Sequence, residues 1–479
     1  MIIKVDPEQL QNTDEKITLQ YLISKHLLNK SRLEKLQDYY EGKHDILYRQ
    51  MLDSSKPNNK IVNNLAAFIT DTIVGYFMGS PVTYSARTEG NDAYVDALTD
   101  IFDDNDEQDL NAELAKGQSV QGVDYELLYT DEDARIRMAE LPAQSIIYVE
   151  SDDVNAEPLL GVRIYEVDDI TKGGISLTDK KYYYEVYDDR EKITYEALKH
   201  NDKVSLREIA REEHYFGEVP IIAYENNKEL LGDFEGVMTL IDAYNLAQSD
   251  TANDFEYFTD AYLTMTGVRL DTEDIRKMKE NRVIGLPDKE CSVDWLIKQV
   301  NDTALENYKN RLRKDIHSLS KTPNLSDESF SGNLTGVAIS YKIWGMDQIV
   351  SVKERKFKKG LQRRIRLITN ILNTTGKNWN YKDIDITFSR NMPQNLTELA
   401  DMVTKLKGLV SQETLLSILP FIDDVELEQE RLEEAKPTID LDMLGGEPDE
   451  GVSPIRNSAG TNDRPDAQTG SLPGIQADA

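Results

Sequence analysis

The sequence predicts an α+β protein in which helical and strand-rich segments follow one another along the chain. Three observations support this. Residues 15–42 and 59–78 repeat apolar side chains at the period of a helix, residues 120–224 alternate them at the period of a strand, and helical periods return from residue 233. Runs of strands followed by runs of helices are typical of α+β architectures. The length of 479 residues suggests about three domains.

The composition limits the classes of protein to which this chain can belong. Its net charge is −32, from 87 acidic and 55 basic residues. A broad basic surface that grips DNA is therefore not expected, although the charge is compatible with a protein past which DNA slides. Cys291 is the single cysteine, so neither an internal disulfide nor a cysteine-based zinc cluster can form.

The chain shows no signal for secretion or for a membrane. Its amino-terminal stretch, MIIKVDPEQLQNTDEK, lacks an apolar signal core. The most apolar helical stretch, residues 61–79, contains Asn63, Asn64 and Asp71 and fails the criterion of roughly 18 uncharged apolar residues for a membrane span. We therefore expect a soluble, reduced protein that is made in the cytoplasm and has no membrane partner.

Two helices are predicted near the amino terminus, over residues 15–42 and 59–78. In the first, Ser31 and Glu34 have the spacing of a capping box, and Gly42 suits a left-handed helix stop. The second helix has a broad apolar stripe, which indicates burial against several neighbours. The stripe consists of Ile61, Leu65, Phe68, Ile69, Thr72, Ile73 and Tyr76.

A third helical stretch, residues 92–116, contains the acidic motif DIFDDNDEQD. Its carboxylates are Asp100, Asp103, Asp104, Asp106, Glu107 and Asp109. A metal site is one interpretation of this motif, and a solvated face or loop is the favoured one.

Residues 120–224 are predicted to form strands. The run VDYELLYTDEDARIRMAEL has two short strand patterns around a polar turn, which indicates a hairpin. Further along, Tyr182 and Tyr184 point to one face of a predicted strand, and Tyr183 and Tyr187 point to the other. These tyrosines are interpreted as sheet packing in preference to a platform on which bases stack.

Helical periods return at residues 233–264, where side chains recur at alternating steps of four and three with a polar middle. The positions are Val237, Ile241, Tyr244, Gln248, Thr251, Phe255, Phe258 and Tyr262. A second helix is predicted over 303–320, with an apolar face made by Leu305, Tyr308, Leu312, Ile316 and Leu319. The residues between the two helices, 265–302, follow the pattern strand, helix, strand, strand. Two long helices that bracket a small tip domain make a stalk with a cap.

The next segment, KTPNLSDESFSGNLTGVAISYK, has the glycines and hydroxyl residues of a phosphate-binding loop. Such a loop needs a lysine and a hydroxyl residue after its last glycine. Here Val337 and Ala338 follow Gly336, so nucleotide binding is not expected. From the residues alone, the favoured interpretation is a polar loop that caps the next helix.

A long helix is predicted over residues 337–373. Its apolar stripe consists of Met346, Val350, Phe357, Leu361, Ile365, Ile368 and Leu372. Its other faces hold a concentrated set of bases, namely Lys353, Arg355, Lys356, Lys358, Lys359, Arg363, Arg364 and Arg366. These bases either contact nucleic acid or pair with an acidic face of a neighbouring subunit, and the second interpretation is favoured.

The remaining chain is predicted to contain a strand within 382–393 and a pair of helices within 391–436. Residues 437–479 are acidic and poor in apolar side chains, so they are expected to be disordered. The histidines are scattered and no hydrolase or zinc-protease motif occurs. No catalytic, metal-ligating or cofactor-binding residue is therefore expected, and no cofactor.

Four segments together resemble the portal proteins of long-tailed (siphovirus-type) bacteriophages, in the branch common among phages of Gram-positive bacteria. They are DYYEGKH, NNKIVNNLAAFITDTIVGYFMGSPVTY, LSKTPNLSDESFSGNLTGVAISYK and LVSQETLLSILPFIDDVELEQERLEEAK, which span about residues 38 to 436 in the family's order. The acidic residues after 436 have no counterpart in this pattern.

The resemblance implies a phage portal fold with an α/β wing, a two-helix stem, a small α/β clip, a long wing helix and a helical crown. The implied parts are a wing at 1–232, stem helices at 233–264 and 303–320, a clip at 265–302, a tunnel loop at 321–336, the long wing helix and return strand at 337–390, a crown at 391–436 and an acidic tail at 437–479. Such subunits form a dodecameric ring at the portal vertex of the capsid, where double-stranded DNA passes during packaging and ejection.

The resemblance also implies partners and contact residues. Terminase and then the head–tail adaptor dock at the clip, for which Val283, Ile284, Trp295 and Ile297 are candidates. The major capsid or scaffolding protein is a further partner. The DNA-facing candidates in the tunnel loop are Asn324, Ser326, Asp327, Glu328, Ser329 and Asn333. The loop has no lysine between Pro323 and Gly336, so a firm grip on DNA is not expected.

Two other classes of protein are weighed against the portal. The first is another structural protein of the phage head, such as a minor head protein or an adaptor, which needs no stalk with a tip domain. The second is a DNA-packaging enzyme, which the missing nucleotide-binding lysine disfavours.

Overall fold

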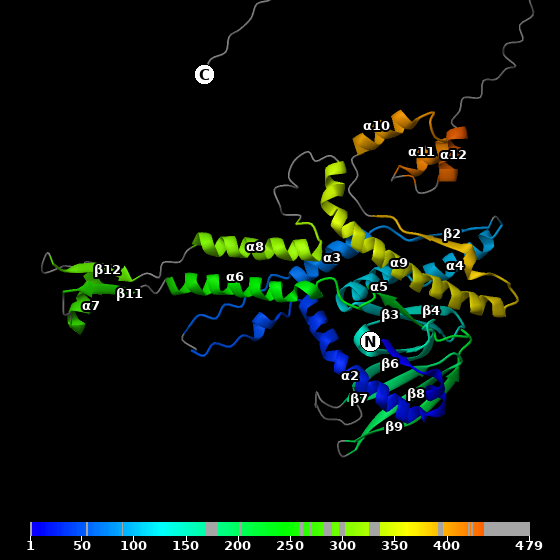
Figure 1. Ribbon diagram of the computed structural model, residues 1–479, viewed down its shortest axis with the longest axis horizontal. Coiled ribbons are helices and arrows are strands. Elements are labelled where there is room, and N and C mark those ends of the chain that lie inside the picture. Colours follow the sequence, from blue (N-terminus) through cyan, green and yellow to red (C-terminus); the bar gives the residue numbers. More distant parts are fainter. Residues whose placement is uncertain are drawn as a thin grey trace, which may run out of the picture. The chain divides into compact units, whose positions relative to one another are not determined.

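The structure, a computed structural model, describes most of the chain (Figure 1). The described residues are 2–53, 56–88, 90–168, 180–200, 203–258, 262–267, 271–281, 290–296, 302–324, 336–390, 396–419, 422 and 425–434. They fall into two compact units, Met1–Asn395 and Leu396–Ala479, which are described separately. Helices and strands both contribute extensively, which confirms the predicted α+β class.

The amino-terminal elements are strand β1 (Ile2–Val5), helix α1 (Pro7–Asn12) and helix α2 (Glu15–Tyr40). The predicted helix is confirmed, and Gly42 follows it with φ of +81°. The predicted cap at Ser31 is wrong, because the helix runs through that residue without interruption. Asp14 caps the helix instead, since its Oδ1 accepts hydrogen bonds from the amides of Lys16 and Ile17.

Helix α3 (Leu65–Met78) begins six residues later than predicted. Asn64 is its cap, with Oδ1 accepting from the amide of Ala67 at 3.2 Å. The predicted helix at 92–116 is two helices, α4 (Asp92–Asp103) and α5 (Glu107–Gln121), separated by Asp106 in a left-handed conformation with φ of 48°. A left-handed residue cannot continue a right-handed helix, so the acidic motif contains the break.

The large sheet has six strands in the order β1, β5, β6, β7, β8, β9. Strand β1 pairs with β5 in parallel, and the other neighbours are antiparallel. The new strands are β5 (Ile146–Ser151), β6 (Pro158–Asp168), β7 (Lys180–Tyr187), β8 (Glu191–His200) and β9 (Lys203–Glu213). A short 3-10 turn at Asp45–Tyr48 (η1) follows α2, and another at Ala143–Ser145 (η2) precedes β5.

Two tyrosines of β7 pack on opposite faces of this sheet, as predicted, whereas Tyr182 is 45% exposed. Tyr184 is buried in a cluster with Leu19 and Leu22 of α2. Tyr187 is buried in a second cluster with Tyr125 of the neighbouring three-stranded sheet. Alternate side chains of one strand therefore join two different cores.

The three-stranded sheet has the order β10, β3, β4. Strands β3 (Val123–Thr130) and β4 (Ile136–Leu141) form the predicted hairpin, and β10 (Ile221–Glu225) pairs with the other side of β3. A separate pair joins β2 (Thr83–Ala86) to β13 (Ile384–Thr387), which is the predicted return strand. A short 3-10 turn at Tyr381–Asp383 (η6) precedes it.

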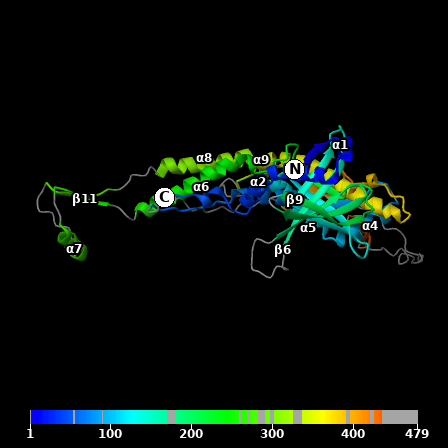
Figure 2. The same ribbon diagram turned by 90° about the horizontal axis from the view of Figure 1, so that it is seen from below.

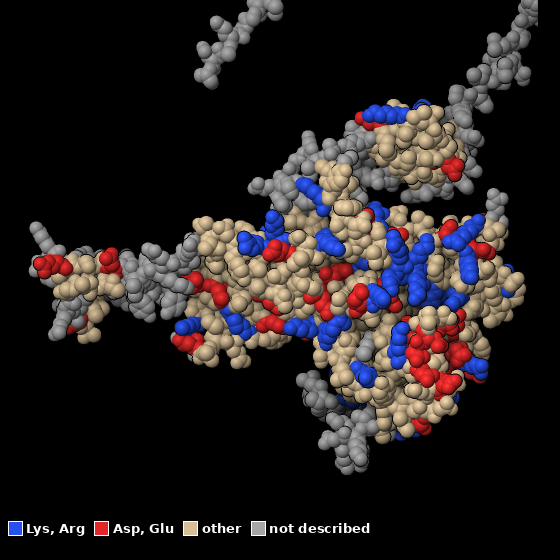
Figure 3. Space-filling view, viewed as in Figure 1, with Lys and Arg blue, Asp and Glu red and all other residues tan. Residues whose placement is uncertain are grey.

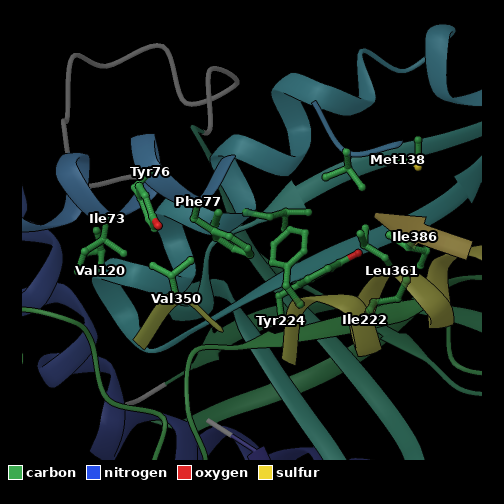
Figure 4. Close-up of a cluster of buried hydrophobic side chains, with 14 of the residues drawn as sticks. Ile73, Tyr76, Phe77, Val120, Met138, Ile222, Tyr224, Val350, Leu361 and Ile386 are labelled. Carbon is green, nitrogen blue, oxygen red and sulfur yellow. The ribbon is translucent and has the colours of Figure 1, made fainter. Parts of the chain in front are cut away.

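Helix α9 (Gly336–Thr374) is the long helix predicted from the sequence. Met346, Val350, Phe357, Leu361, Ile365 and Ile368 of its predicted stripe are buried. Figure 4 shows side chains of α3, β10 and α9 meeting around Tyr224. A Cβ atom on Gly360 would lie 2.4 Å from Cε1 of Tyr224, so glycine at this position lets α9 approach β10 closely.

The bases of α9 mostly bind acids and carbonyls of the same chain, which corrects the predicted pairing with a neighbouring subunit. Lys353 is buried against Asp233 at 2.5 Å, and Lys356 pairs with Glu225. The remaining internal partners are Glu218 for Arg363 and Arg366, the carbonyl of Ile386 for Lys358, and Glu107 with Glu126 for Arg364. Arg355 and Lys359 are exposed.

Helix α6 (Met238–Phe258) follows a 3-10 turn at Glu235–Val237 (η4) and is shorter than the predicted 233–264 helix, because Tyr262 already begins strand β11 (Tyr262–Thr266). Helix α7 (Thr272–Asn281), strand β12 (Ser292–Leu296) and helix α8 (Asp302–Ser320) follow. The second unit holds α10 (Leu396–Leu406), α11 (Gln412–Ser417) and α12 (Val425–Glu434), where a pair of helices was predicted. Residues 437–479 lie outside the described residues.

Asp124 on β3 is fully buried beneath Gly117 of α5, where a Cβ atom would lie 2.0 Å from Asp124 Oδ2. Burial and the nearby Glu140 carboxyl raise the pKa of Asp124 well above its usual value, and burial raises the pKa of Glu140 as well. The folded protein therefore binds a proton at this pair more tightly than the unfolded chain does. The free energy of unfolding should fall as pH rises above the ordinary carboxyl range and stay reduced above the raised pKa.

We predict that Asp124→Asn raises the free energy of unfolding at pH 8 by roughly 1–3 kcal/mol, because the amide carries no charge to desolvate. At pH 4 the difference from the parent should be small. Chemical unfolding followed by circular dichroism at both values of pH measures it, with the exposed Asp133→Asn as the matched control. An equal gain at both values of pH would show that Asp124 is not the protonated group.

Candidate functional site

Helices α6 and α8 lie side by side, with the β11–α7–β12 module inserted between them in the sequence (Figures 1 and 2). Strands β11 and β12 pair antiparallel from Tyr262 with Leu296 to Thr266 with Ser292. Ile241 of α6 and Ile316 of α8 are fully buried in the same apolar cluster. The first predicted strand, the helix and the last predicted strand are therefore present between α6 and α8. The predicted strand that contains Val283 and Ile284 lies outside the described residues.

The buried face of α8 differs from the predicted one. Leu312 and Ile316 are buried as expected, but Tyr308 and Leu319 are 49% and 65% exposed. Lys309, His317 and Ser320 are buried in their place. The reason is that the neighbours offer polar and aromatic partners: His317 meets Phe68 edge to face at 5.5 Å, and Ser320 exchanges a 2.7 Å hydrogen bond with Thr322. Burial lowers the pKa of His317.

Helix α6 holds an extended segment through three polar side chains spaced four residues apart. The amide of Asn59 donates to Asn253 Oδ1 at 2.7 Å, that of Ile61 to Ser249 Oγ at 2.9 Å, and that of Asn63 to Asn245 Oδ1 at 2.8 Å. We call these three contacts the polar ladder. Two extended residues span roughly 6.6 Å and four helical residues roughly 6.0 Å, so the two periods match over this distance.

A second layer of contacts fixes the inner end of the polar ladder. Asn245 donates from Nδ2 to His44 Nδ1 at 2.8 Å, and Nε2 of His44 donates to the carbonyl of Tyr39 at 3.0 Å. The His44 ring stacks on Tyr39 at 4.6 Å between centroids, and Tyr39 donates to Asp242 at 2.8 Å. The end of α2, the turn after it and α6 are thus joined by one buried network.

The side-chain pattern of this helix predicts that Gln248 and Thr251 are the polar residues in the middle of its packed face. These two side chains bond locally, to Tyr244 and to the carbonyl of Ala247. The residues that hold the segment are Asn245, Ser249 and Asn253. The available signal was their four-residue spacing, which places the three side chains on one face of the helix.

Asn324 is the one predicted DNA-facing residue among those that the structure describes. Asn324 is half-buried, and Arg313 of α8 donates to its Oδ1 at 3.4 Å. Ser326, Asp327, Glu328, Ser329 and Asn333 lie outside the described residues. The described ends of this loop are residues 321–324, in which the buried Pro323 lies three residues after the end of α8, and Gly336, where α9 starts.

Of the four predicted docking residues in the tip module, the structure describes the backbone position of one. Trp295 lies on β12 opposite Leu263 of β11. Val283, Ile284 and Ile297 lie outside the described residues. The structure therefore supplies the strand pairing of the module.

The acidic motif of α4 and α5 has one member with a structural role. Glu107 is buried and binds Arg364 Nη1 at 2.6 Å. Across the described part of the chain, no three His, Cys, Asp or Glu side chains are grouped as metal ligands would be. Within the same residues, no helix has the length and apolar character that crossing a membrane requires.

Comparison with known proteins identifies the family. Residues 19–440 match the description "Phage portal protein, SPP1 Gp6-like". The chain belongs to this family of phage portal proteins. It is 26% identical over 417 residues to the portal protein of Bacillus phage SPP1, which covers 84% of this chain and 80% of that protein. It is 23% identical over 447 residues to the portal protein of Clostridium phage phiCD119, covering 88% and 97%.

The family match accounts for the helices and the loop together. It includes the α6–α8 pair, the module between them, residues 321–336 and α9. Portal proteins are structural components of the phage particle, and the family is not an enzyme family. The resemblance stated from the four sequence segments is therefore confirmed.

We predict that Asn245→Ala lowers the free energy of unfolding by about 2–3 kcal/mol, because it leaves Nδ1 of the buried His44 and the amide of Asn63 without their partners. Asn253→Ala, at the less buried end of the polar ladder, should cost less than half as much. Chemical unfolding measures both. Limited proteolysis should cut within residues 45–64 faster in the Asn245 variant alone, and equal rates for both variants would contradict the assigned order of strength.

Proposed function

We propose that this portal protein assembles into a ring, expected to be dodecameric, at one vertex of the capsid. Double-stranded viral DNA passes through its central channel during packaging and ejection. The observation that supports this most directly is the family match over residues 19–440, which spans the helix pair, its inserted module and the following loop.

In this proposal the parts of the chain have distinct roles. Residues 1–232 with 337–390 form the wing, α6 and α8 form the stem, and the module between them, within 265–302, is the clip. Residues 321–336 are the tunnel loop, and the helices within 391–436 form the crown. The stem assignment is supported by the mutual packing of α6 and α8 and by the polar ladder, which stiffens α6 along one side.

Partners follow from these roles. Terminase docks on the clip during packaging and the head–tail adaptor replaces it afterwards, with Val283, Ile284, Trp295 and Ile297 as candidate contacts. The major capsid or scaffolding protein contacts the ring within the head. No cofactor is assigned to any of these steps.

The experiment that tests the ring is native mass spectrometry of the purified full-length protein, with electron micrographs of the same sample. A particle near twelve subunit masses with a central channel is the expected result. A monomer at micromolar concentration, with the chain folded by circular dichroism, would instead favour another head structural protein, such as a minor head protein or adaptor. A packaging enzyme is disfavoured by the absent Walker lysine in the sequence.

The tunnel loop should act on DNA by shape and weak repulsion. It contains Asp327 and Glu328 and no lysine between Pro323 and Gly336, so few counterions are released when DNA passes. We predict that Asp327→Lys with Glu328→Lys slows or arrests DNA packaging while rings still assemble. Packaging by mutant procapsids, scored as the length of nuclease-protected DNA at low salt, measures this. The matched control is Asp327→Asn with Glu328→Gln, and full-length packaging by the lysine variant at the normal rate would remove the loop from the DNA path.

The clip should need an apolar surface for docking or for contact between neighbouring subunits. We predict that Ile284→Asp reduces ring assembly or terminase binding at least about tenfold, because a charge must then be desolvated at the contact, while the wing remains folded. Ring mass and a pull-down with purified terminase report the two effects separately. Ile284→Val is the control, and normal packaging by the aspartate variant would contradict the assignment.

A further inference from the structure

A cleft lies between the amino-terminal helices and the six-stranded sheet, in a part of the chain to which the proposed function assigns no partner. Its cavity volume is about 560 Å³, which is within the usual range of binding pockets. The floor is apolar, since Leu19, Val186 and Ile193 line it and are buried. Leu10 of α1 and Leu159 of β6 form half-buried apolar walls. The cleft can therefore receive an apolar side chain.

The rim of this cleft is acidic. Glu15, Asp188 and Asp189 line it, and no basic residue is among its lining residues. Asp189 is 65% exposed and lies 3.7 Å from Arg190, which is itself 85% exposed. Glu15 is shared by Arg211 at 3.3 Å and by the hydroxyl of Tyr195 at 2.8 Å. A cation that arrived at the rim would find an open carboxylate at Asp189.

The surroundings extend this negative charge. Residues 6–15 contain four acids, residues 152–157 three and residues 188–189 two, and none of these segments contains a base. The second segment lies beside the first, because the amide of Asp152 donates to the carbonyl of Val5 at 3.1 Å. Lys16, Arg190 and Arg211 border the region. Figure 3 shows acidic side chains gathered over this part of the molecule, around β6 and the start of α2.

We propose that this cleft is a docking site for a segment of a partner protein that presents one or two large apolar side chains flanked by lysines or arginines. The apolar floor removes the apolar side chain from water, and the acidic rim attracts the flanking cations and fixes their register. Nucleic acid does not fit the site, because its phosphates would meet carboxylates on the whole rim. The lining residues of the site lie between Pro7 and Tyr195 in the sequence, outside the proposed stem, clip and tunnel loop.

The test uses the full-length protein and a fluorescein-labelled helical peptide of leucine and lysine, with binding read by fluorescence anisotropy. A peptide with serine in place of each leucine is the charge-matched probe. We expect the leucine–lysine peptide to bind at least about tenfold more tightly than the serine–lysine peptide. Asp189→Lys should weaken the leucine–lysine peptide about tenfold, and Leu159→Ser should weaken it by a similar factor without changing the binding of the serine–lysine peptide.

The matched control is Glu132→Lys, which makes the same change of charge at an exposed residue of the β3–β4 turn. Equal weakening by Glu132→Lys and Asp189→Lys would reduce the effect to net charge and overturn the proposal. Equal affinity of both peptides for the parent protein would do the same. Unchanged thermal unfolding of the three variants confirms that each is folded.

A second measurement identifies where the peptide binds on the protein. A benzophenone-bearing residue replaces one leucine of the peptide, and the cross-linked protein is digested and sequenced by mass spectrometry. Cross-links within residues 7–19, 158–160 or 186–195 support the site, and cross-links confined to other segments overturn it. Direct binding of a short labelled DNA duplex that cross-links to the same segments would also overturn the proposal, since it would make the surface a nucleic-acid site.

Discussion

Arg364 is the charge around which the larger unit is organised. It is fully buried on α9, with Nε 2.8 Å from Glu126 Oε1 on β3 and Nη1 2.6 Å from Glu107 Oε1 at the start of α5. Tyr224 of β10 donates to the same Glu126 at 2.7 Å. One guanidinium thus fixes the relative positions of two helices and two strands. Removing one partner from such a buried group typically costs 3–5 kcal/mol, so this register of α9 is strongly preferred over its neighbours.

The same helix is tied to the start of α6 by a second buried ion pair. Lys353 binds Asp233, which also accepts from the Ser119 hydroxyl and from Asn226. Burial lowers the pKa of Lys353, while the Asp233 carboxylate opposes that shift. Asp233 lies five residues before α6 begins, and the polar ladder continues along that helix. The position of α6 is therefore set at its start by α9 and along its side by residues 59–63.

Several of these features can be predicted from the sequence, and others cannot. The β3–β4 hairpin and the apolar stripe of α9 follow from side-chain periodicity, which burial on one face imposes directly. Arg364 lies three residues after Leu361 and four before Ile368, so it shares their face, and Glu126 lies in a predicted strand between Tyr125 and Leu127. That coincidence of two charges in buried positions was the signal for an internal pair, but the sequence alone does not tell which distant acid meets which base. The start of α3 was misplaced because α6 holds residues 59–63 extended through alternate backbone amides, and the side-chain pattern does not show those contacts.

For the candidate site, periodicity located the helix pair and the start of α9. It could not supply contacts for the tunnel loop or the clip, because those contacts depend on side-chain placement and on other molecules.

The internal use of bases determines what the surface offers to other molecules. The chain has 32 more acids than bases, and most bases of α9 are held by acids and carbonyls of the same chain. Arg355 and Lys359 of α9 remain exposed, but the excess of acids over bases keeps the net charge of the chain strongly negative. Acidic surface repels phosphates at distances up to the Debye length, and under the proposed function this repulsion would let DNA pass without binding where it meets such a surface. The same surface attracts partners that carry basic side chains. In the proposed ring, the sign of the charge would therefore separate passing DNA from docked proteins before any shape is recognised.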